Sequence, residues 1–222
     1  MKKSLITLSL FSSIFISTNV LSDELKNGAE NFKGLNLGLG LNVLKFNSNY
    51  SDSVGPQDNV NYHTVNVTPR FDASYTFDLN NKWLLGLGLS LDLYPIDGDK
   101  HSLSQSVWGG GDWKSRTTNH YSVYLTPTYL IDDSLAVFGK LSYQSKNIDN
   151  IWTYPDGYND HVRLNGIGAG LGIKKMINQN IYLQIEGEYV DYSNKSLSNQ
   201  YGTWIYDSNS SYSGTLSIGY HF

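Results

Sequence analysis

Hydrophobic and polar residues alternate along most of the chain. In the last run, 212–222, the apolar, aromatic or glycine positions are Tyr212, Gly214, Leu216, Ile218, Tyr220 and Phe222. A period of two gives a β-strand with one apolar and one polar face. The pattern recurs at 32–44, 62–77, 83–94, 120–130, 135–144, 164–174, 181–192 and 212–222. Pro69 and Pro127 lie within two of these runs, and we expect a β-bulge at each because proline cannot donate to the ladder.

The connections between the runs alternate in length. The short ones, 78–81, 131–134 and 178–180, are rich in Asn and Asp, which favour tight turns. The long ones are 47–61, 95–119, 145–162 and 193–211. Runs of about ten residues cross a bilayer as tilted strands, and turns sorted by side are typical of outer-membrane barrels. The pattern predicts an all-β fold: an eight-stranded antiparallel up-and-down transmembrane barrel with four long surface loops and short periplasmic turns.

Charged residues inside the cores of the runs support this register. All seven fall on the polar face: Arg70, Asp72, Asp92, Lys140, Lys174, Glu186 and Glu188. A charge facing lipid at mid-bilayer would cost about 2–4 kcal/mol, so these side chains are expected to point into the barrel. We expect Arg70 and Lys140 to pair with some of the acidic residues Asp72, Asp92, Glu186 and Glu188.

Composition narrows the class of protein further. Residues 1–22 have the basic start (Lys2, Lys3) and short apolar core of a secretory signal peptide, which leaves 23–222 as the barrel domain. The net charge of −4 makes nucleic acid a poor partner. Cysteine is absent, so disulfides and thiolate sites are excluded. After residue 22 no run approaches the length of a transmembrane helix, about 18 apolar residues.

Together these features resemble the eight-stranded bacterial outer-membrane barrels of the opacity-protein, OmpX and OmpA transmembrane-domain type. The resemblance implies a Gram-negative outer membrane, exposure at the cell surface, and contact with outer-membrane lipid and lipopolysaccharide. Only the last run resembles a defined signature, the one read by the outer-membrane assembly machinery. Its residues here are Leu216, Ile218, Tyr220 and Phe222.

Two features of the expected interior leave alternatives open. An eight-stranded barrel is just wide enough for its own side chains to fill, so the charged network is either a polar plug or a narrow gated path for ions. Gly166, Gly168, Gly170 and Gly172 all face inward. They either make room for large inward neighbours such as Tyr124, Phe138 and Tyr182, or leave a small cavity for an apolar ligand.

The long loops carry the candidate binding surface. Its aromatic residues are Trp108, Trp113, Trp152, Tyr154, Tyr158, Tyr201, Trp204 and Tyr206. Tyr and Trp give rigid contact area, which is typical of binding surfaces. They could instead pack into a β-rich extension of the barrel or rest on lipopolysaccharide. Lys100, Lys114 and Arg116 could meet its phosphates or remain solvated.

Catalysis has little support in the sequence. His120-Tyr-Ser122 superficially resembles the His-x-Ser of lipid A deacylases, but it lies on the polar face and no glutamate follows at a suitable spacing. Asp97-Gly-Asp99 lacks the spacing of a calcium loop, and we expect no metal or cofactor. We therefore predict a non-enzymatic structural or adhesive surface protein whose loops contact host or cell-surface ligands. The alternative is a narrow channel or carrier for small apolar solutes, and a lipid A-modifying enzyme is less favoured.

Overall fold

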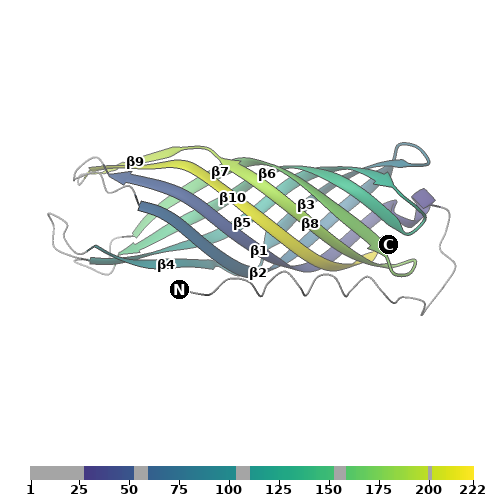
Figure 1. Ribbon diagram of the computed structural model, residues 1–222, viewed down its shortest axis with the longest axis horizontal. Helices are drawn as coiled ribbons and strands as arrows, with labels where there is room; N and C mark the ends of the chain where they lie inside the picture. The colour runs from purple at the N-terminus through teal and green to yellow at the C-terminus, as the bar shows by residue number, and fades with distance from the viewer. Residues whose placement is uncertain (1–27, 53–59, 104–110, 153–158, 200–201) are drawn as a thin grey trace, which may run out of the picture.

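The computed structural model describes residues 28–52, 60–103, 111–152, 159–199 and 202–222. Nearly all of these residues lie in β-strands (Figure 1). The elements are η1 (Gly28–Asn31), β1 (Gly34–Asp52), β2 (Val60–Asp78), β3 (Trp83–Asp92), β4 (Ile96–Leu103), β5 (Gly111–Leu130), β6 (Leu135–Trp152), β7 (Asn159–Met176), β8 (Ile181–Tyr192), β9 (Lys195–Asn199) and β10 (Gly202–His221). Among the described residues, no helix has the length and apolar character needed to cross a membrane.

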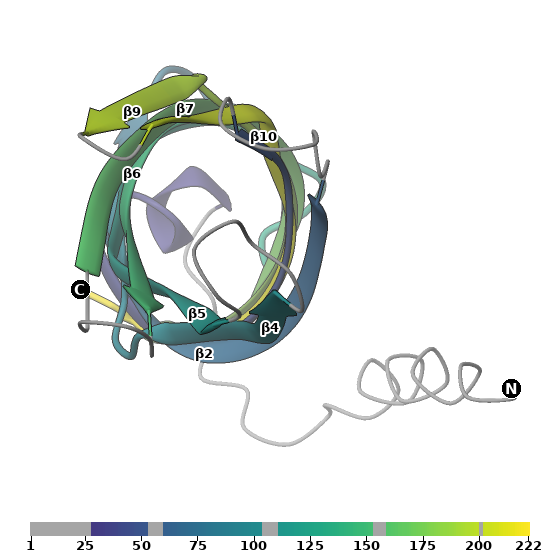
Figure 2. The ribbon, with the colours of Figure 1, turned by 90° about the vertical axis from the view of Figure 1, so that its left-hand side faces the viewer.

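Eight of the strands close into a barrel, as predicted. Neighbours pair antiparallel in the order β1-β2-β3-β5-β6-β7-β8-β10, and β10 pairs back to β1 (Figure 2). In that closing ladder Leu41 lies opposite Leu216. β4 and β9 lie outside the ring and pair only with β5 and β10, respectively. The predicted up-and-down topology is therefore confirmed.

Side chains alternate between the outside and the lumen of the barrel. Outward residues such as Ile167 and Leu171 are 72% and 75% exposed, which suits strands whose apolar face meets lipid. The inward residues are mostly polar, and many of them are buried. Aromatic pairs mark both ends of the outward face: Trp83 with Tyr129, and Tyr189 with Tyr212. Aromatic girdles are therefore present, and the strand charges point inward as predicted.

The three short turns share one side-chain device. The side-chain Oδ1 of Asn80, Asp132 and Asn178 accepts the backbone N–H groups two and three residues later, at 2.7–3.0 Å. These bonds hold the chain reversed in the manner of Asx turns. The bonds from Ser134 and Leu135 favour the Asp132 carboxylate and lower its pKa. The Asn/Asp-rich connections are thus the tight turns that the sequence predicts. We call this end of the barrel the turn end.

At the opposite end, the predicted long loops are largely strand, which corrects their boundaries. β5 already begins at Gly111, β6 continues to Trp152 and β10 begins at Gly202. β4 and β9 lie within segments expected to be loops. Beyond the lipid both faces of a strand are wet, so the ladder continues without alternating apolar residues. The period-two signal therefore marks the spanning part of each strand and misses the rest.

The two prolines do not cause bulges, so that prediction is wrong. Pro69 sits where pairing with β3 ends, and its carbonyl accepts the N–H of Leu93 at 2.8 Å. At Pro127 the ladder to β6 skips two residues but resumes in the same register, with Gly139 opposite. The β5–β6 register shifts instead between Thr118 and Tyr121. Proline has no backbone N–H to donate. At Pro69 this is accommodated because pairing with β3 ends there, and at Pro127 because two residues of β5 leave the ladder to β6 without a change of register.

The turn end is closed by the segment before β1, of which the sequence analysis placed only the part from Phe32 onward in the first strand. η1 lies across this end, visible through the barrel in Figure 2. The N–H of Gly28 donates to Asp133 Oδ1 at 3.0 Å, and the Asn31 amide donates to the Asp133 carbonyl at 2.8 Å. Phe32 is buried in an inner cluster, whose other members are Leu84, Leu130, Ala136, Met176 and Tyr182.

A glycine permits the change of direction from η1 into β1. Gly34 has φ = 133°, a conformation that L-residues rarely adopt. A Cβ at this position would lie 2.7 Å from the carbonyl oxygen of Phe222. The first strand therefore begins at Gly34. Phe32 is not a strand residue but packs in the inner cluster and closes the turn end.

Candidate functional site

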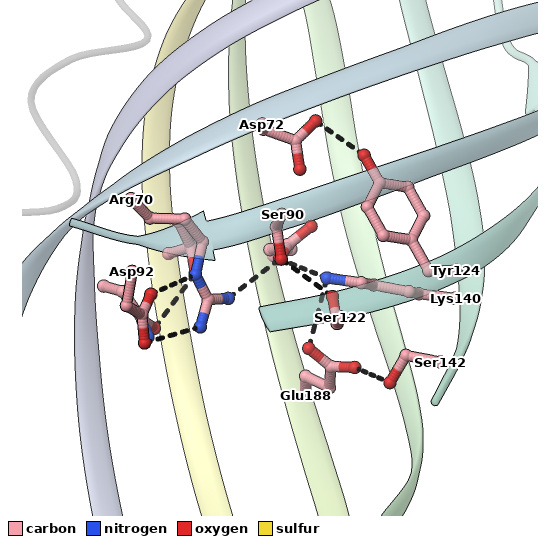
Figure 3. A network of polar contacts seen from close by, with 12 residues as sticks. Arg70, Asp72, Ser90, Asp92, Ser122, Tyr124, Lys140, Ser142 and Glu188 are labelled. Carbon is pink, nitrogen blue, oxygen red and sulfur yellow. Dashed lines mark hydrogen bonds and ion pairs between the residues drawn. The ribbon is translucent and has the colours of Figure 1, made fainter. Parts of the chain in front are cut away.

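Five buried charged side chains meet inside the barrel and form the lumen network (Figure 3). Arg70 Nε lies 2.7 Å from Asp92 Oδ1, and its Nη1 lies 3.9 Å from Glu186 Oε1. Lys140 Nζ lies 2.8 Å from Glu186 Oε1 and 3.1 Å from Glu188 Oε2. Each buried charge therefore has an opposite charge beside it, without which it would cost several kcal/mol.

Asp72 joins the lumen network through a tyrosine rather than through a cation. The Tyr124 hydroxyl donates to Asp72 Oδ1 at 2.6 Å. Lys140 Nζ lies 4.7 Å from the centre of the Tyr124 ring, within the range of a cation–π contact. The six charged residues that the sequence analysis expected to pair therefore lie in one connected interior region.

Glycines of β7 allow side chains of β6 and β8 to meet, although β7 lies between those strands. A Cβ on Gly168 would lie 2.5 Å from Ser142 Oγ and 2.8 Å from Glu188 Oε1. A Cβ on Gly170 would lie 3.2 Å from the Cβ of Glu188. The bond from Ser142 to Glu188, at 2.5 Å, therefore passes over a strand position that has no side chain.

Other inward glycines are covered by large neighbours, as one of the two sequence interpretations predicted. A Cβ on Gly88 would meet Tyr124 at 2.4 Å, and one on Gly172 would meet Phe138 at 2.2 Å. Tyr182 similarly covers Gly219. A cavity beside Phe32 and Lys174 has a volume of about 20 Å³, room for about one water. This space is too small for an apolar solute.

Three further lumen residues were not recognised from the sequence as part of the network. His120 Nδ1 lies 2.5 Å from Asp92 Oδ2, and its Nε2 lies 2.8 Å from Gln144 Oε1. The Tyr192 hydroxyl donates to the same Gln144 oxygen at 3.1 Å. Strand parity could have placed all three in the lumen. Ser122 is engaged with Ser90 at 2.7 Å, so the His120–Ser122 pair suggested by the sequence is not assembled.

The end of the lumen away from the turns contains a buried lysine. Lys146 is 1% exposed, and its Nζ lies 3.4 Å and 3.9 Å from the ring centres of Phe46 and Tyr192. Within the described residues its Nζ has no hydrogen-bond partner, and it lies against the faces of the two rings. Apolar residues surround it and, with the two rings, form the outer cluster: Phe46, Ile148, Val162, Leu164, Val190 and Tyr192.

Beyond the barrel, the strand extensions with β4 and β9 form a crown. β3 pairing ends at Asp92 and β8 pairing at Tyr192. Past these points the ladders run β9-β10-β1-β2 and β4-β5-β6-β7. In the described ranges no ladder joins β2 to β4 or β7 to β9, so the crown is two four-stranded sheets with open edges.

The crown contains half of the predicted aromatic binding surface. The register sets Trp113 of β5 opposite Trp152 of β6. Trp204 of β10 lies opposite Asp52 of β1. Tyr206 follows two residues later on β10. The remaining four predicted residues lie outside the described residues: Trp108, Tyr154, Tyr158 and Tyr201.

Lys114 and Arg116 of the crown are both paired with Asp97. Lys114 Nζ lies 2.9 Å from Asp97 Oδ2, and Arg116 Nε lies 2.8 Å from Asp97 Oδ1. Hydrogen bonds from Lys114 and Arg116 lower the pKa of the Asp97 carboxyl. The described residues contain no group of three His, Asp or Glu side chains placed to hold a metal ion.

The residues of the predicted assembly signature share one face of β10. Ile218, Tyr220 and Phe222 are exposed and Leu216 is half-buried, all on the outward side. The rings of Tyr220 and Phe222 pack at 4.7 Å between centroids. Recognition of this face by the assembly machinery stays a prediction.

The closed ring, the apolar exterior and the polar lumen define the class of bacterial outer-membrane β-barrels. The outer membrane protein beta-barrel domain family matches residues 8–222, and the chain belongs to this family. The protein is therefore an outer-membrane protein, and its turn end is the periplasmic end.

Solved structures share this fold. OprG of Pseudomonas aeruginosa is 14% identical with a TM-score of 0.54, covering 86% of this chain and 96% of that one. Neisserial surface protein A is 12% identical with a TM-score of 0.50, covering 86% and 98%. The outer membrane protease OmpT of Escherichia coli is 13% identical with a TM-score of 0.50, covering 93% and 100%. At such identities the likeness shows the fold alone. No curated protein sequence matches the chain.

Proposed function

We propose that this protein is a non-enzymatic surface protein whose crown binds ligands on host or neighbouring cells. The observation that carries the proposal is the length of the crown. β5 begins at Gly111, whereas Tyr121 of the outer girdle lies well down the same strand. At about 3.3 Å per residue along a tilted strand, the crown extends about 25 Å beyond the membrane. A barrel that served only to cross the membrane has no need of such an extension.

The chemistry of the crown suits protein or glycan recognition. Trp113 and Trp152 occupy facing positions on neighbouring strands. Aromatic residues of this kind commonly carry much of the energy of a binding interface. The open edges of the two sheets can also accept an extended segment of a partner by strand addition.

The lumen gives less support to the other candidate functions. The inner cluster, the lumen network and the outer cluster fill it in succession, which disfavours a carrier of apolar solutes. A lipid A-modifying enzyme is disfavoured because His120 and Ser122 bind other partners inside the barrel. In this proposal outer-membrane lipid and lipopolysaccharide contact the outward face, and the assembly machinery reads the 216–222 strand end.

The test is adherence of bacteria that display barrels with altered crowns. The double variant Trp113→Ala/Trp152→Ala should lose most binding to host cells or matrix, at least about tenfold if the pair forms a binding hot spot. The matched control is Tyr189→Ala/Tyr212→Ala, which removes a facing aromatic pair inside the membrane girdle. Adherence is normalised to the amount of folded barrel, measured by its altered mobility in unheated gels. Unchanged adherence in the Trp113/Trp152 variant, and also after Trp204→Ala and Tyr206→Ala, would contradict the proposal.

A further inference from the structure

A proline ends the pairing of β3 with β2 at the base of the crown. The Leu93 N–H donates to the Pro69 carbonyl at 2.8 Å. Continued two residues further, this register would place Pro95 opposite Val67, and proline has no N–H to donate to the Val67 carbonyl. The chain leaves the ladder here and continues as β4, which pairs only with β5. Within the described residues, β2 above Pro69 is therefore not laddered to any strand on its β3 side.

The alternation of an antiparallel ladder shows which backbone groups are left unpaired. Pro69 turns its carbonyl toward β3, so every second residue before it, including Val67 and Val65, turns its N–H and C=O to the same side. The residues between them, such as Asn66, face β1, to which β2 remains paired above Pro69. The open edge thus presents the main-chain donors and acceptors of alternate residues over 60–67.

This edge lacks the protection that the other three crown edges have. β9 has only five residues and carries Lys195, and β4 has eight residues with a register shift in its ladder. β7 carries the exposed side chains of His161 and Arg163. Short length, irregular pairing and charge are usual means by which proteins keep edge strands from pairing. Residues 60–67 of β2 have the sequence VNYHTVNV, with no Lys, Arg, Asp or Glu.

Exposed apolar side chains flank the open edge. Val65 and Val67 are 64% and 62% exposed on the outward side, and Leu93 and Tyr94 are exposed where β3 leaves the ladder. Beyond this point β2 and β4 diverge toward the free end of the crown (Figure 1). Apolar or β-branched residues at alternate positions of an added strand can pack beside the two valines.

The open edge lies at and beyond the outer girdle. β1 pairs Lys45 both with Tyr212 of the girdle and with Val65, and residues 60–64 of β2 lie further out. Unpaired main chain at hydrocarbon depth would cost several kcal/mol per group, so the edge faces water or lipid headgroups. A partner outside the cell can therefore reach it.

We propose that the open edge of β2, residues 60–67, binds an extended, uncharged segment of a partner protein on a host or neighbouring cell as an added strand. This rests on the proposed surface function and names the form in which the partner is recognised. The segment runs antiparallel to β2, in the position that β3 would occupy if it continued beyond Pro95. Main-chain hydrogen bonds hold it, and its alternate side chains pack beside Val65 and Val67.

A second copy of the chain in the same membrane does not fit this edge. Strands of such barrels tilt by about 35–45° from the barrel axis. Two side-by-side barrels related by a two-fold axis along the membrane normal would therefore cross their β2 edges at about 70–90°. Strands that cross at this angle cannot form a ladder.

Nuclear magnetic resonance of the refolded wild-type barrel in micelles detects the added strand directly. The probe is a peptide of about eight alternating threonine and valine residues, with lysines at both ends for solubility, added up to about 2 mM. The Val65 and Val67 amides should exchange more slowly with water, whereas Asn66, already bonded to β1, should gain no protection. A copy methylated on every backbone nitrogen, which cannot donate to β2, should have no effect. No protection at Val65 and Val67, or equal effects of the two peptides, overturns the inference.

A proline variant tests the same edge on bacteria. Val65→Pro/Val67→Pro removes two edge N–H groups and leaves the ladder to β1, as Pro69 does at the next such position. Peptide binding and adherence to host cells, at equal amounts of folded barrel, should fall at least about tenfold, the effect of losing two hydrogen bonds. The matched control is Val43→Ala, which trims the residue opposite Val67 on β1 and should behave as wild type.

The outcomes separate this inference from the proposed function. Unchanged adherence in the proline variant overturns the edge, while loss of adherence in the Trp113/Trp152 variant still supports a binding crown. Dimers of the purified barrel that the proline variant abolishes would assign the edge to a second copy and overturn the inference as well.

Discussion

At the residue scale, strand parity determines which side chains enter the lumen, but not which of them meet. Arg70 and Lys140 fall on the polar face by counting alone. Their actual partners depend on the stagger between strands, which brings together positions far apart in sequence. The Lys140 contact with Glu188 also needs glycines on the strand between them. One of the two sequence interpretations was that inward glycines make room for large residues, but neither was that they let charges meet across a strand.

Substitution of one of these glycines should show this effect. Gly168→Ala places a methyl group against Ser142 Oγ and Glu188 Oε1, so we expect it to lower the free energy of unfolding by about 1–3 kcal/mol. The matched control is Gly187→Ala on the lipid-facing side, where the nearest atom is 3.9 Å from the added Cβ and the change should be within about 0.5 kcal/mol. Urea unfolding in lipid vesicles, followed by gel mobility, measures both. Equal stability of the two variants would argue against packing over β7.

At the element scale, strands and turns could be predicted correctly wherever contact with lipid imposes an alternation of apolar and polar residues. The tight turns were predictable because Asn80, Asp132 and Asn178 carry the acceptors that such turns need. The crown strands were not predictable, because both of their faces meet water and their residues therefore need not alternate between apolar and polar. η1 was missed for a different reason: Phe32 is apolar and adjoins the first run, and its burial depends on residues of other strands.

Burial of Phe32 at the turn end should contribute measurably to the stability of the barrel. Phe32→Ala removes a buried ring from the inner cluster, and we expect a loss of about 3 kcal/mol in the free energy of unfolding. Leu35→Ala is the control, since Leu35 faces lipid at the start of β1 and is 41% exposed. Urea unfolding is again the measurement. A Phe32 variant no less stable than the Leu35 variant would show that η1 does not seal the barrel.

At the scale of the whole molecule, the protein separates a closed membrane body from an open surface structure. Two apolar clusters and a network of paired charges fill the lumen of the barrel, whereas the crown ends in two sheets with unpaired edges. The fold and the location followed from the sequence, because both depend on the lipid-facing pattern. The division of the crown into two sheets did not follow from the sequence, because it depends on where β3 and β8 stop pairing with their neighbours.

The most direct test of a surface function is to remove the crown and leave the barrel intact. Segments 47–64, 97–118, 147–163 and 194–209 are each replaced by a short Asn-Gly turn, which suits antiparallel strands. Bacteria that display this shortened barrel are compared with wild type for adherence to host cells, at equal amounts of folded barrel by gel mobility. The account predicts that adherence is lost while the barrel still folds. Adherence equal to wild type in the crownless barrel would contradict it.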